Sequence, residues 1–439
     1  MTLATGPISD AAGAQDDMKL VTPAFYGSGD PHALWRRLRS EDPVHLTRTH
    51  FSKPFWSITR HEDAKQVLLN DDRIFSIERN GVGASLLAGP EFEDPEASLY
   101  TELSQSGQQL AVMDGVPHTD LRRYFMERFS PAGVRSLDQL VRTVTHEVLD
   151  EIIERGECDF TTDFAGRVPT AVISAIMGVP KDRWTDLYRW NNMLAAPDDP
   201  EFNIGTPIET NTFALKNILD TCIELAEERR GKGGDDLLTS LTLAKVNDRP
   251  LTPTEIGFNG LMFFAAGHET TRASMSAGMN ELLRNPDQLE YLRSHRHDSK
   301  VLRAAAEEFV RWSAPVTHTL RTATEDTMVG GRLIKEGDWV VVWFHAANRD
   351  PAVFANPETF DVRRSPNPHL GFAVGKHFCL GAHLARLDMQ VMLEVLLDRL
   401  DDIELAGPVE LSSSILFWGV KHMPIRFRKR SGSDEAKAA

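Results

Sequence analysis

The chain has 439 residues, enough for one large domain or for two to three ordinary ones. Hydrophobic residues make up 41% and charged residues 26%, a balance typical of a globular protein with a sizeable core. The formal net charge of −16 disfavours nucleic acids and anionic membrane surfaces as main partners. Three scattered cysteines are too few for a disulfide framework, so a reducing, cytoplasmic setting is expected.

Both ends of the chain are predicted to be tails. Residues 1–18 are rich in Ala, Gly and Asp and lack the apolar core of a signal peptide, and residues 1–22 are expected to be mobile. Residues 429–439 are polar. The most apolar run, 261–266, is far shorter than the roughly 20 residues of a membrane span, so no membrane anchor is expected. No repeat or composition break interrupts residues 23–428, which are predicted to form a single domain.

The first part of this domain mixes element types. Residues 55–59 alternate in the manner of a short strand, and residues 62–69 follow as a helix. Residues 80–114 lack periodicity and hold several Gly and Pro, so a long loop is expected, of a kind that is often functional. Helices are then predicted at 119–129, 133–155, 168–176, 181–195 and 210–230.

The clearest helix signal begins at Thr252. A capping threonine is followed by Pro253 in the first turn and by Glu255, the usual order at a helix start. The helix is predicted to run through Arg284, and at about 1.5 Å per residue it would cross the whole molecule. The fold class is therefore mainly α with a minor β portion. The later helices and strands are expected at 286–293, 302–312, 331–334, 339–343, 381–400 and within 415–428.

The most informative segment, residues 372–381, surrounds Cys379. Gly375 permits a tight turn, and Gly381 lets the following helix approach a flat cofactor closely. The N-terminus of that helix favours an ionised sulfur at Cys379. A thiolate is an electron-rich axial ligand for haem iron and favours cleavage of the O–O bond.

A second unusual segment, residues 266–271, lies in the middle of the long helix. Gly267, Thr270 and Thr271 are weak helix formers, and threonine hydroxyls can take backbone carbonyls away from the helical ladder. Residues that disfavour a helix but lie in the middle of one often mark a functional site. A crossing of two helices through small residues explains the same pattern without any function.

Taken one at a time, other segments also have simple explanations. Cys379 could be an inert buried cysteine, or could bind zinc with His377 and His383, although the paired cysteine spacing of zinc sites is absent. Glu308 and Arg311 lie three residues apart, a spacing frequent on solvated helix faces. Single arginines elsewhere are usually surface residues.

Together these segments resemble the cytochrome P450 superfamily of haem-thiolate monooxygenases, of the soluble bacterial type, from about residue 23 to residue 428. The cysteine-loop pattern of that family is filled in order by Phe372, Gly375, His377, Cys379 and Gly381. One departure is Ala373, where the family usually has glycine. The resemblance implies the cytochrome P450 fold, in which haem b lies between the long central helix and the cysteine-loop helix, with Cys379 as the iron ligand.

The resemblance also implies roles for residues outside the cysteine loop. Thr270 would stabilise activated dioxygen through its hydroxyl and ordered water, and Glu269 would relay protons. The haem propionates need buried cationic partners, which would be His118, Arg122, Arg321 and His377. A buried structural triad would be formed by Glu308, Arg311 and Arg364. The substrate would contact Met262, Ala265, Ala266, Val316, Thr317 and Phe417.

The implied activity is insertion of one oxygen atom from dioxygen into a C–H bond of a hydrophobic small molecule, which would be a steroid, a terpenoid, a fatty chain or another secondary metabolite. Residues 367–372 look like those of bacterial members that act on steroids, terpenoids or fatty chains. Three cysteines cannot hold a four-thiolate cluster, and no flavin fingerprint is present, so electrons would come from a separate ferredoxin or flavodoxin with its NAD(P)H reductase. A basic patch for this donor is expected from Arg122, Arg123, Arg128 and Lys376.

Two other functions remain open at this point. A peroxide-using or isomerising haem-thiolate enzyme would need no electrons, but such members commonly lack the acid–alcohol pair seen here as Glu269 and Thr270. A non-catalytic haem-binding protein would not need that pair either. Consumption of NAD(P)H linked to turnover would separate both from a monooxygenase.

Overall fold

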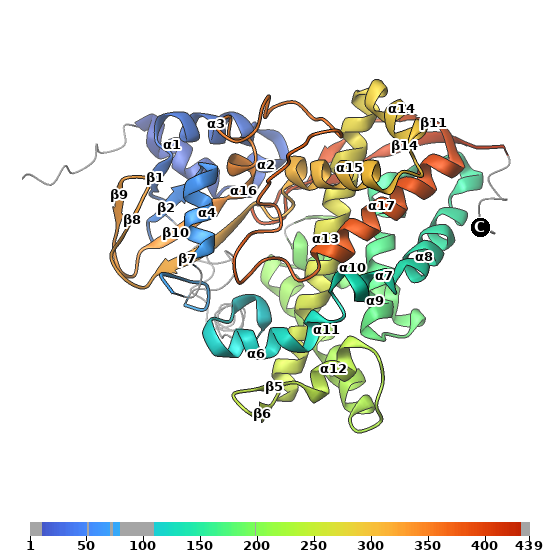
Figure 1. Cartoon of the computed structure of the whole chain (residues 1–439), viewed down its shortest axis with the longest axis horizontal. Helices are drawn as coiled ribbons and strands as arrows, with labels where there is room; N and C mark the ends of the chain where they lie inside the picture. The colour runs from blue at the N-terminus through green and yellow to red at the C-terminus, as the bar shows by residue number, and fades with distance from the viewer. Residues whose placement is uncertain (1–10, 51, 71–72, 80–108, 198, 432–439) are drawn as a thin grey trace, which may run out of the picture.

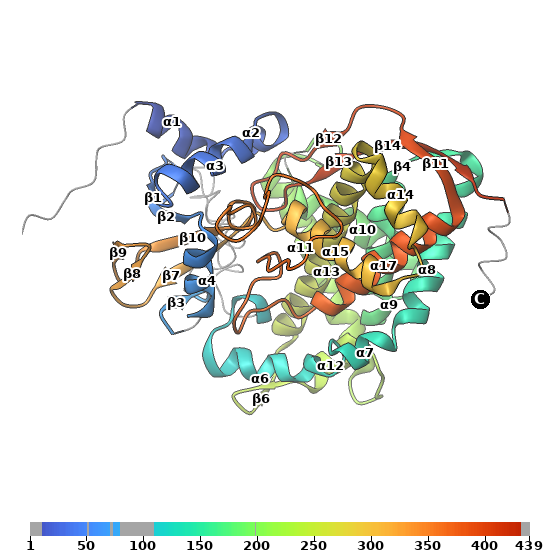
Figure 2. The same cartoon turned by 45° about the horizontal axis from the view of Figure 1, so that its top comes forward.

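A computed structural model describes residues 11–50, 52–70, 73–79, 109–197 and 199–431. Two regions lie side by side (Figure 1). One contains a five-stranded sheet with the N-terminal helices, and the other is almost entirely helical. Figure 2 shows the same division after a rotation, with α1–α4 on the sheet side and α8, α9, α14 and α17 on the other. The prediction of a mainly helical fold with a minor sheet portion is confirmed.

The five-stranded sheet joins segments that are far apart in the sequence. Its strand order is β1-β2-β10-β7-β3, where β2 and β10 run parallel and the other neighbours run antiparallel. The buried face of the sheet packs against α4, which supplies Val67 and Leu68 to the same apolar cluster. The strands are β1 (Val44–Thr47), β2 (Phe55–Ile58), β3 (Phe75–Ser76), β7 (His318–Ala323) and β10 (Trp339–Trp343).

The remaining strands form four smaller sheets among the described residues. A three-stranded sheet has the order β11-β14-β4, and three two-stranded ribbons pair β5 with β6, β8 with β9, and β12 with β13. The bounds are β4 (Glu157–Asp159), β5 (Lys245–Val246), β6 (Arg249–Pro250), β8 (Thr327–Val329), β9 (Arg332–Ile334), β11 (Leu400–Leu405), β12 (Glu410–Leu411), β13 (Val420–His422) and β14 (Pro424–Lys429).

The helix expected from Thr252 to Arg284 is α13 (Pro253–Arg284), which crosses the molecule as the long yellow helix of Figure 1. Thr252 Oγ1 accepts a hydrogen bond from the Glu255 N–H, and Glu255 accepts one from the Thr252 N–H, so a complete capping box starts the helix. Its neighbours approach closely at glycines. A Cβ atom on Gly278 would lie 2.2 Å from the ring of Phe309, which explains the glycine there.

The other helices pack around α13, notably α9, α11 and α15. The segment 133–155, expected as one helix, is divided, because α7 ends at Arg135 and a new helix with an acid in its first turn begins at Asp138. The helices are α1 (Ala11–Leu20), α2 (Pro23–Ser28), α3 (Pro31–Glu41), α4 (His61–Leu69), α6 (Gly115–Met126), α7 (Pro131–Arg135), α8 (Asp138–Asp150), α9 (Arg167–Met177), α10 (Trp184–Ala195), α11 (Pro207–Arg229), α12 (Leu237–Leu243), α14 (Pro286–Ser294), α15 (Ser299–Ser313), α16 (Phe344–Ala347) and α17 (Ala382–Arg399), with single turns η3 (Leu110–Val112), η4 (Ile153–Arg155), η5 (Phe160–Ala165) and η6 (Lys181–Arg183).

The termini differ in part from the expected tails. Residues 11–20 form α1, and Leu20 and Val21 are buried against the N-terminal helices and the sheet, so packing begins before residue 23. Residues 1–10 and 432–439, and residues 80–108 of the expected long loop, lie outside the described residues. None of the described helices is both long enough and apolar enough to cross a bilayer.

Candidate active site

The middle of α13 is accessible although most of the helix is buried. Ala266 is exposed and Thr270 is partly exposed, whereas the neighbours Phe264, His268 and Thr271 are buried. The Thr270 hydroxyl donates to the Ala266 carbonyl at 2.7 Å, which leaves its oxygen free to accept a hydrogen bond. The break in helical propensity at residues 266–271 therefore coincides with an opening beside the helix.

The cysteine loop is held by its own backbone. The Cys379 N–H donates to the Phe372 carbonyl at 2.9 Å, and the Phe378 N–H donates to the Gly375 carbonyl at 3.1 Å. Gly375 has φ of +83°, and a Cβ atom there would lie 2.5 Å from the Leu68 carbonyl oxygen, so only glycine fits this turn. Ala373 also has a positive φ, +53°, which explains why glycine is usual at this position in the family it resembles.

The two segments fit a flat ligand. Cys379 is partly exposed, and a Cβ atom built on Gly381 would meet nothing within 4 Å, so space lies open beside the sulfur. Helices α13 and α17 contact each other, α13 has accessible residues at Ala266 and Thr270, and α17 begins directly after the partly exposed Gly381. Desolvation raises the pKa of the Cys379 thiol, while the Gly381 N–H and the charges of Arg122 and Arg386 act in the opposite direction. These donors suit a thiolate bound to a metal porphyrin.

The predicted propionate partners converge in part. The rings of His118 and His377 lie 4.3 Å apart, and Arg122 donates to the Phe378 carbonyl at 2.6 Å, so three of the four residues border the cysteine loop. His377 Nε2 is buried 3.8 Å from Asp114 Oδ1, beyond hydrogen-bonding distance. Arg321 comes from β7, where it is buried and donates to Thr319 Oγ1 and the Leu320 carbonyl.

The expected basic patch is smaller in the structure than the sequence indicates. Arg122 points inward to the cysteine loop, and Arg128 is paired with the carboxylate and carbonyl of Asp235. Arg123 remains 72% exposed, with Asp120 at 3.5 Å, and Lys376 is exposed. Of the four predicted cations, Arg123 and Lys376 are exposed, whereas Arg122 and Arg128 bind other parts of the chain.

Glu308, Arg311 and Arg364 meet in the core. Arg311 binds both Glu308 oxygens at 2.7 and 2.8 Å, and Arg364 Nε lies 3.2 Å from Oε2. The side chains of Glu308 and Arg311 have no exposed surface. The guanidinium of Arg311 also donates to three carbonyls, those of Asn348, Pro357 and Thr359, so the triad ties α15 to the segment that precedes the cysteine loop.

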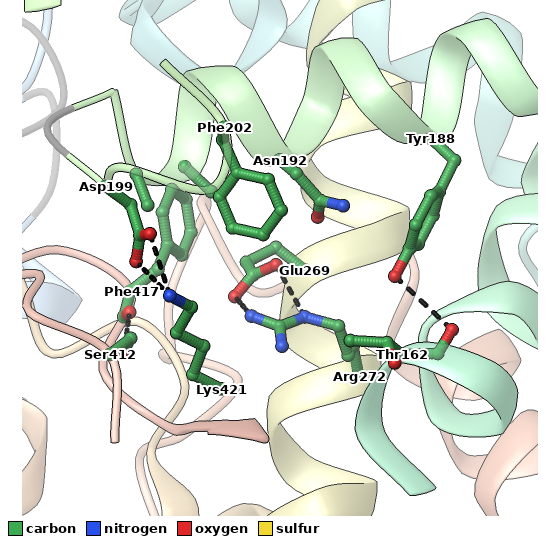
Figure 3. Close-up of a pocket in the computed structure, with 12 residues that line it drawn as sticks. Thr162, Tyr188, Asn192, Asp199, Phe202, Glu269, Arg272, Ser412, Phe417 and Lys421 are labelled. Carbon is green, nitrogen blue, oxygen red and sulfur yellow. Dashed lines mark hydrogen bonds and ion pairs between the residues drawn. The ribbon is translucent and has the colours of Figure 1, made fainter. Parts of the chain in front are cut away.

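Glu269 lines a pocket and is paired with a residue that the sequence analysis missed. Its two carboxylate oxygens accept hydrogen bonds from Arg272, with Nε to Oε2 at 2.9 Å (Figure 3). Arg272 also donates to the Val420 carbonyl at 3.1 Å. Arg272 follows Glu269 by the same spacing that relates Arg311 to Glu308, and this spacing was the available sequence signal.

The pocket lies between α10, α13 and the residues around β12 and β13. Phe202 and Phe417 form its apolar wall, and Lys421, bound to Asp199 at 2.7 Å, closes one side (Figure 3). Tyr188 also lines it, and burial raises the pKa of this phenol. Phe417 was predicted to contact substrate, whereas Tyr188 and Lys421 were not singled out.

The other predicted substrate residues are distributed around the accessible part of α13. Met262 and Ala265 are partly exposed on the helix, and Val316 pairs with Phe417 in an isolated bridge. Thr317 is fully buried, and its N–H donates to the Leu416 carbonyl at 2.9 Å. Thr317 thus joins the backbone of this wall and presents no exposed surface.

Comparison with known proteins agrees with this geometry. The family model "Cytochrome P450" matches residues 52–404. The chain is 32% identical over 407 residues to the linalool 8-monooxygenase of Pseudomonas putida, covering 92% of this chain and 98% of that protein. It is 33% identical over 397 residues to the steroid C26-monooxygenase of Mycolicibacterium smegmatis, covering 89% of each.

A solved structure shares the whole architecture. Cytochrome P450 CYP268A2 of Mycobacterium marinum, in complex with pseudoionone, superposes with a TM-score of 0.85 at 29% identity, covering 97% of this chain and all of that one. The cysteine loop, the accessible break in α13 and these matches lead to one conclusion. The chain belongs to the bacterial cytochrome P450 family and is a haem-dependent monooxygenase.

Proposed function

We propose that this enzyme inserts one oxygen atom from dioxygen into a C–H bond of a hydrophobic small molecule of the terpenoid or steroid type. The observation that carries the proposal is Cys379, which is held by the Phe372 carbonyl beside the open space at Gly381. The named relatives act on linalool and on a steroid, which supports these two classes. Apolar contacts to the substrate come from Met262, Ala265, Ala266, Val316 and Phe417.

The cofactor of the proposal is haem b, with Cys379 as its axial ligand. Bound haem supplies the oxygen chemistry, while the protein supplies ligand, orientation and protons. His118, Arg122, Arg321 and His377 are cationic or polar groups of the kind that buried propionates need. Phe372 and Gly381 would contact the haem on the side of Cys379.

The proton path of the proposal runs through α13. The Thr270 hydroxyl donates to the Ala266 carbonyl and can accept a hydrogen bond from a water, because its lone pairs are free. Glu269 is held by Arg272 at the pocket edge, so its carboxylate must leave this pair to deliver a proton toward Thr270. Arg272 thereby becomes part of the proposed relay.

Two variants test the ligand and the relay. Cys379→Ser should abolish the thiolate-type carbon monoxide difference spectrum of the reduced enzyme, because the sulfur ligand is lost. Thr270→Ala should keep that spectrum and uncouple NAD(P)H consumption from product, with hydrogen peroxide formed instead. Tight coupling in Thr270→Ala would contradict the relay, and an unchanged spectrum in Cys379→Ser would contradict the ligand.

The substrate class is tested by titrating the purified enzyme with terpenoids, steroids and fatty acids. A ligand that displaces water from the iron changes the spin state and hence the absorbance. Terpenoids or steroids are expected to give the larger shift, and a shift with fatty acids alone would contradict the assignment.

The electron donor of the proposal is a separate ferredoxin or flavodoxin with its NAD(P)H reductase, which docks at the exposed Arg123 and Lys376. The double substitution Arg123→Glu with Lys376→Glu should slow reduction by an acidic ferredoxin and leave reduction by dithionite unchanged. Equal changes in the rates of reduction by both reductants would show that these residues are not part of the docking surface.

A further inference from the structure

A cation on α17, Arg386, packs against Phe372 in the cysteine loop. The guanidinium carbon of Arg386 is 4.4 Å from the ring centroid of Phe372, within the range of a cation–π contact. Phe372 is 8% exposed, and its carbonyl accepts the hydrogen bond from the Cys379 N–H. The charge of Arg386 acts on the Cys379 thiol, and Arg386 also packs on the ring of Phe372, whose carbonyl holds the backbone of Cys379.

Arg386 is held in place by Glu307. Its Nε and Nη2 atoms lie 2.6 and 3.0 Å from the two carboxylate oxygens, and the Arg386 side chain is 14% exposed. A guanidinium bound in this planar fork keeps one orientation over the ring. Glu307 belongs to α15, where it precedes the buried triad residue Glu308.

His369 adds a neutral contact to the same carboxylate. The Gly371 N–H donates to His369 Nδ1 at 3.2 Å, so Nδ1 carries a lone pair. The proton must then be on Nε2, which donates to Glu307 Oε2 at 3.0 Å. Desolvation raises the pKa of Glu307, but hydrogen bonds from His369 and Arg386 outweigh it and lower the pKa to about 2. Of the two charged groups that contact Phe372 or hold that contact in place, Arg386 is positive and Glu307 is negative.

We infer that Arg386 is a positioning residue that tunes the reduction potential of the haem–Cys379 centre through its contact with Phe372, and that Glu307 moderates this effect. The inference rests on the proposed ligation of haem by Cys379. A positive charge near the iron–sulfur bond stabilises the reduced state, which is more negative, and a negative charge stabilises the oxidised state. Arg386 and Arg122 are the cations that act on the Cys379 thiol in the described structure.

The two members of the pair are predicted to shift the potential in opposite directions. In the holoenzyme, Arg386→Gln should move the midpoint potential to more negative values, because the cation is removed. Glu307→Gln should move it to more positive values, because the opposing charge is removed while the amide oxygen still accepts from Arg386. Spectroelectrochemical titration measures both shifts, and the carbon monoxide difference spectrum checks that the thiolate ligand is retained.

Arg303 offers a matched control on α15. Its Nε lies 3.8 Å from Glu307 Oε1 and its side chain is 58% exposed, so Arg303→Gln removes a charge of the same sign without touching Phe372. This variant should keep the wild-type potential. Arg386→Lys keeps the charge but not the planar stack and should give a potential between those of wild type and Arg386→Gln.

The results of these titrations either support or overturn the inference. Shifts of the same sign in Arg386→Gln and Glu307→Gln, or potentials unmoved in both, would overturn it. If Arg386→Gln failed to fold, Arg386→Lys would carry the test, and a wild-type potential there would overturn it. Absence of a thiolate-type spectrum in the wild-type enzyme would instead overturn the proposed function itself.

Discussion

Two buried ion pairs in this enzyme share one local design and differ in their surroundings. Glu308–Arg311 on α15 and Glu269–Arg272 on α13 are both separated by three residues and both form a two-bond fork. The Glu308 carboxylate accepts further hydrogen bonds from Arg364, the Asn367 amide and the Asp361 N–H. Among the described residues, the hydrogen bonds to Glu269 both come from Arg272, and this pair borders a pocket.

The difference teaches that long-range partners, not the local spacing, decide what such a pair does. A buried carboxylate whose lone pairs all accept hydrogen bonds is held in place, because losing any of these hydrogen bonds in the interior costs free energy. A carboxylate with one partner beside a pocket can exchange that partner for water or for a hydroxyl. We therefore assign the α15 pair to architecture and the α13 pair to the proposed proton relay.

The largest loss expected from one substitution at a fixed pH follows from breaking the fully partnered pair. Glu308→Gln leaves Arg311 and Arg364 in the core without a compensating charge, and should lower the free energy of unfolding by about 3–5 kcal/mol. Guanidinium unfolding of the purified holoenzyme, followed by circular dichroism, measures this loss.

The same helix that carries the relay also offers a control with identical spacing. Glu281 and Arg284 lie 3.9 Å apart, and the Arg284 side chain is 57% exposed, so Arg284→Gln should cost less than about 1 kcal/mol. Equal losses of unfolding free energy in Glu308→Gln and Arg284→Gln would show that burial and further partners do not determine the strength of such a pair. That result would contradict the contrast drawn between the α15 and α13 pairs.

Asp388 extends the comparison to a buried acid without a charged partner. Its Oδ1 atom has no hydrogen-bond partner among the described residues, and burial raises its pKa to about 8. The unfolded chain releases this proton near its ordinary pKa of 3.8, whereas the folded protein keeps it until about pH 8. Stability should therefore fall by up to about 1.4 kcal/mol per pH unit between these values, and stay level above pH 8.

Asp388→Asn removes this titration. The melting temperature of the variant relative to wild type should rise steadily from pH 5 to pH 8. A difference between the two proteins that is the same at every pH would contradict a buried neutral carboxyl at position 388.

Sequence patterns predicted the regions where local chemistry dominates. The capping residues of α13, the glycines of the cysteine loop and the spacing of Glu308 and Arg311 are each short-range signals, and the structure has the corresponding elements. The strand β7 was missed because His318–Ala323 is mostly polar in sequence although every residue is buried, so it shows neither the alternation of a half-buried strand nor the apolar run of a fully buried one.

Sequence patterns did not predict the residues that share the pocket with Glu269, for a different reason. Tyr188 and Lys421 reach the pocket from α10 and β13, and nothing in the sequence around either residue indicates that they share a site. The basic patch was overestimated for the same reason, because the inward turn of Arg122 depends on the distant carbonyl of Phe378.

Breaking the less-partnered pair should have a smaller effect on stability. Glu269→Gln keeps an acceptor for Arg272, which also retains its bond to the Val420 carbonyl, so the loss should be about 1–3 kcal/mol. The same unfolding experiment as for Glu308→Gln measures it. A loss as large as that of Glu308→Gln would mean that the α13 pair is also a structural element, and would weaken its assignment to the relay.

The smallest expected effect concerns the cysteine loop itself. Ala373 has φ of +53°, a conformation that costs a residue with a side chain about 1–2 kcal/mol, whereas glycine adopts it freely but loses about 0.5–1 kcal/mol of backbone entropy on folding. Ala373→Gly should therefore raise the free energy of unfolding by about 0–1.5 kcal/mol. Ala385→Gly, within α17, should lower it by about 1 kcal/mol because that residue is helical. Opposite signs in these two variants would show that the loop around Cys379 keeps its shape against a local backbone preference, so the hydrogen bonds on either side of Ala373 must hold it. A loss of stability in both variants would mean that the side chain of Ala373 contributes more by packing than its conformation costs.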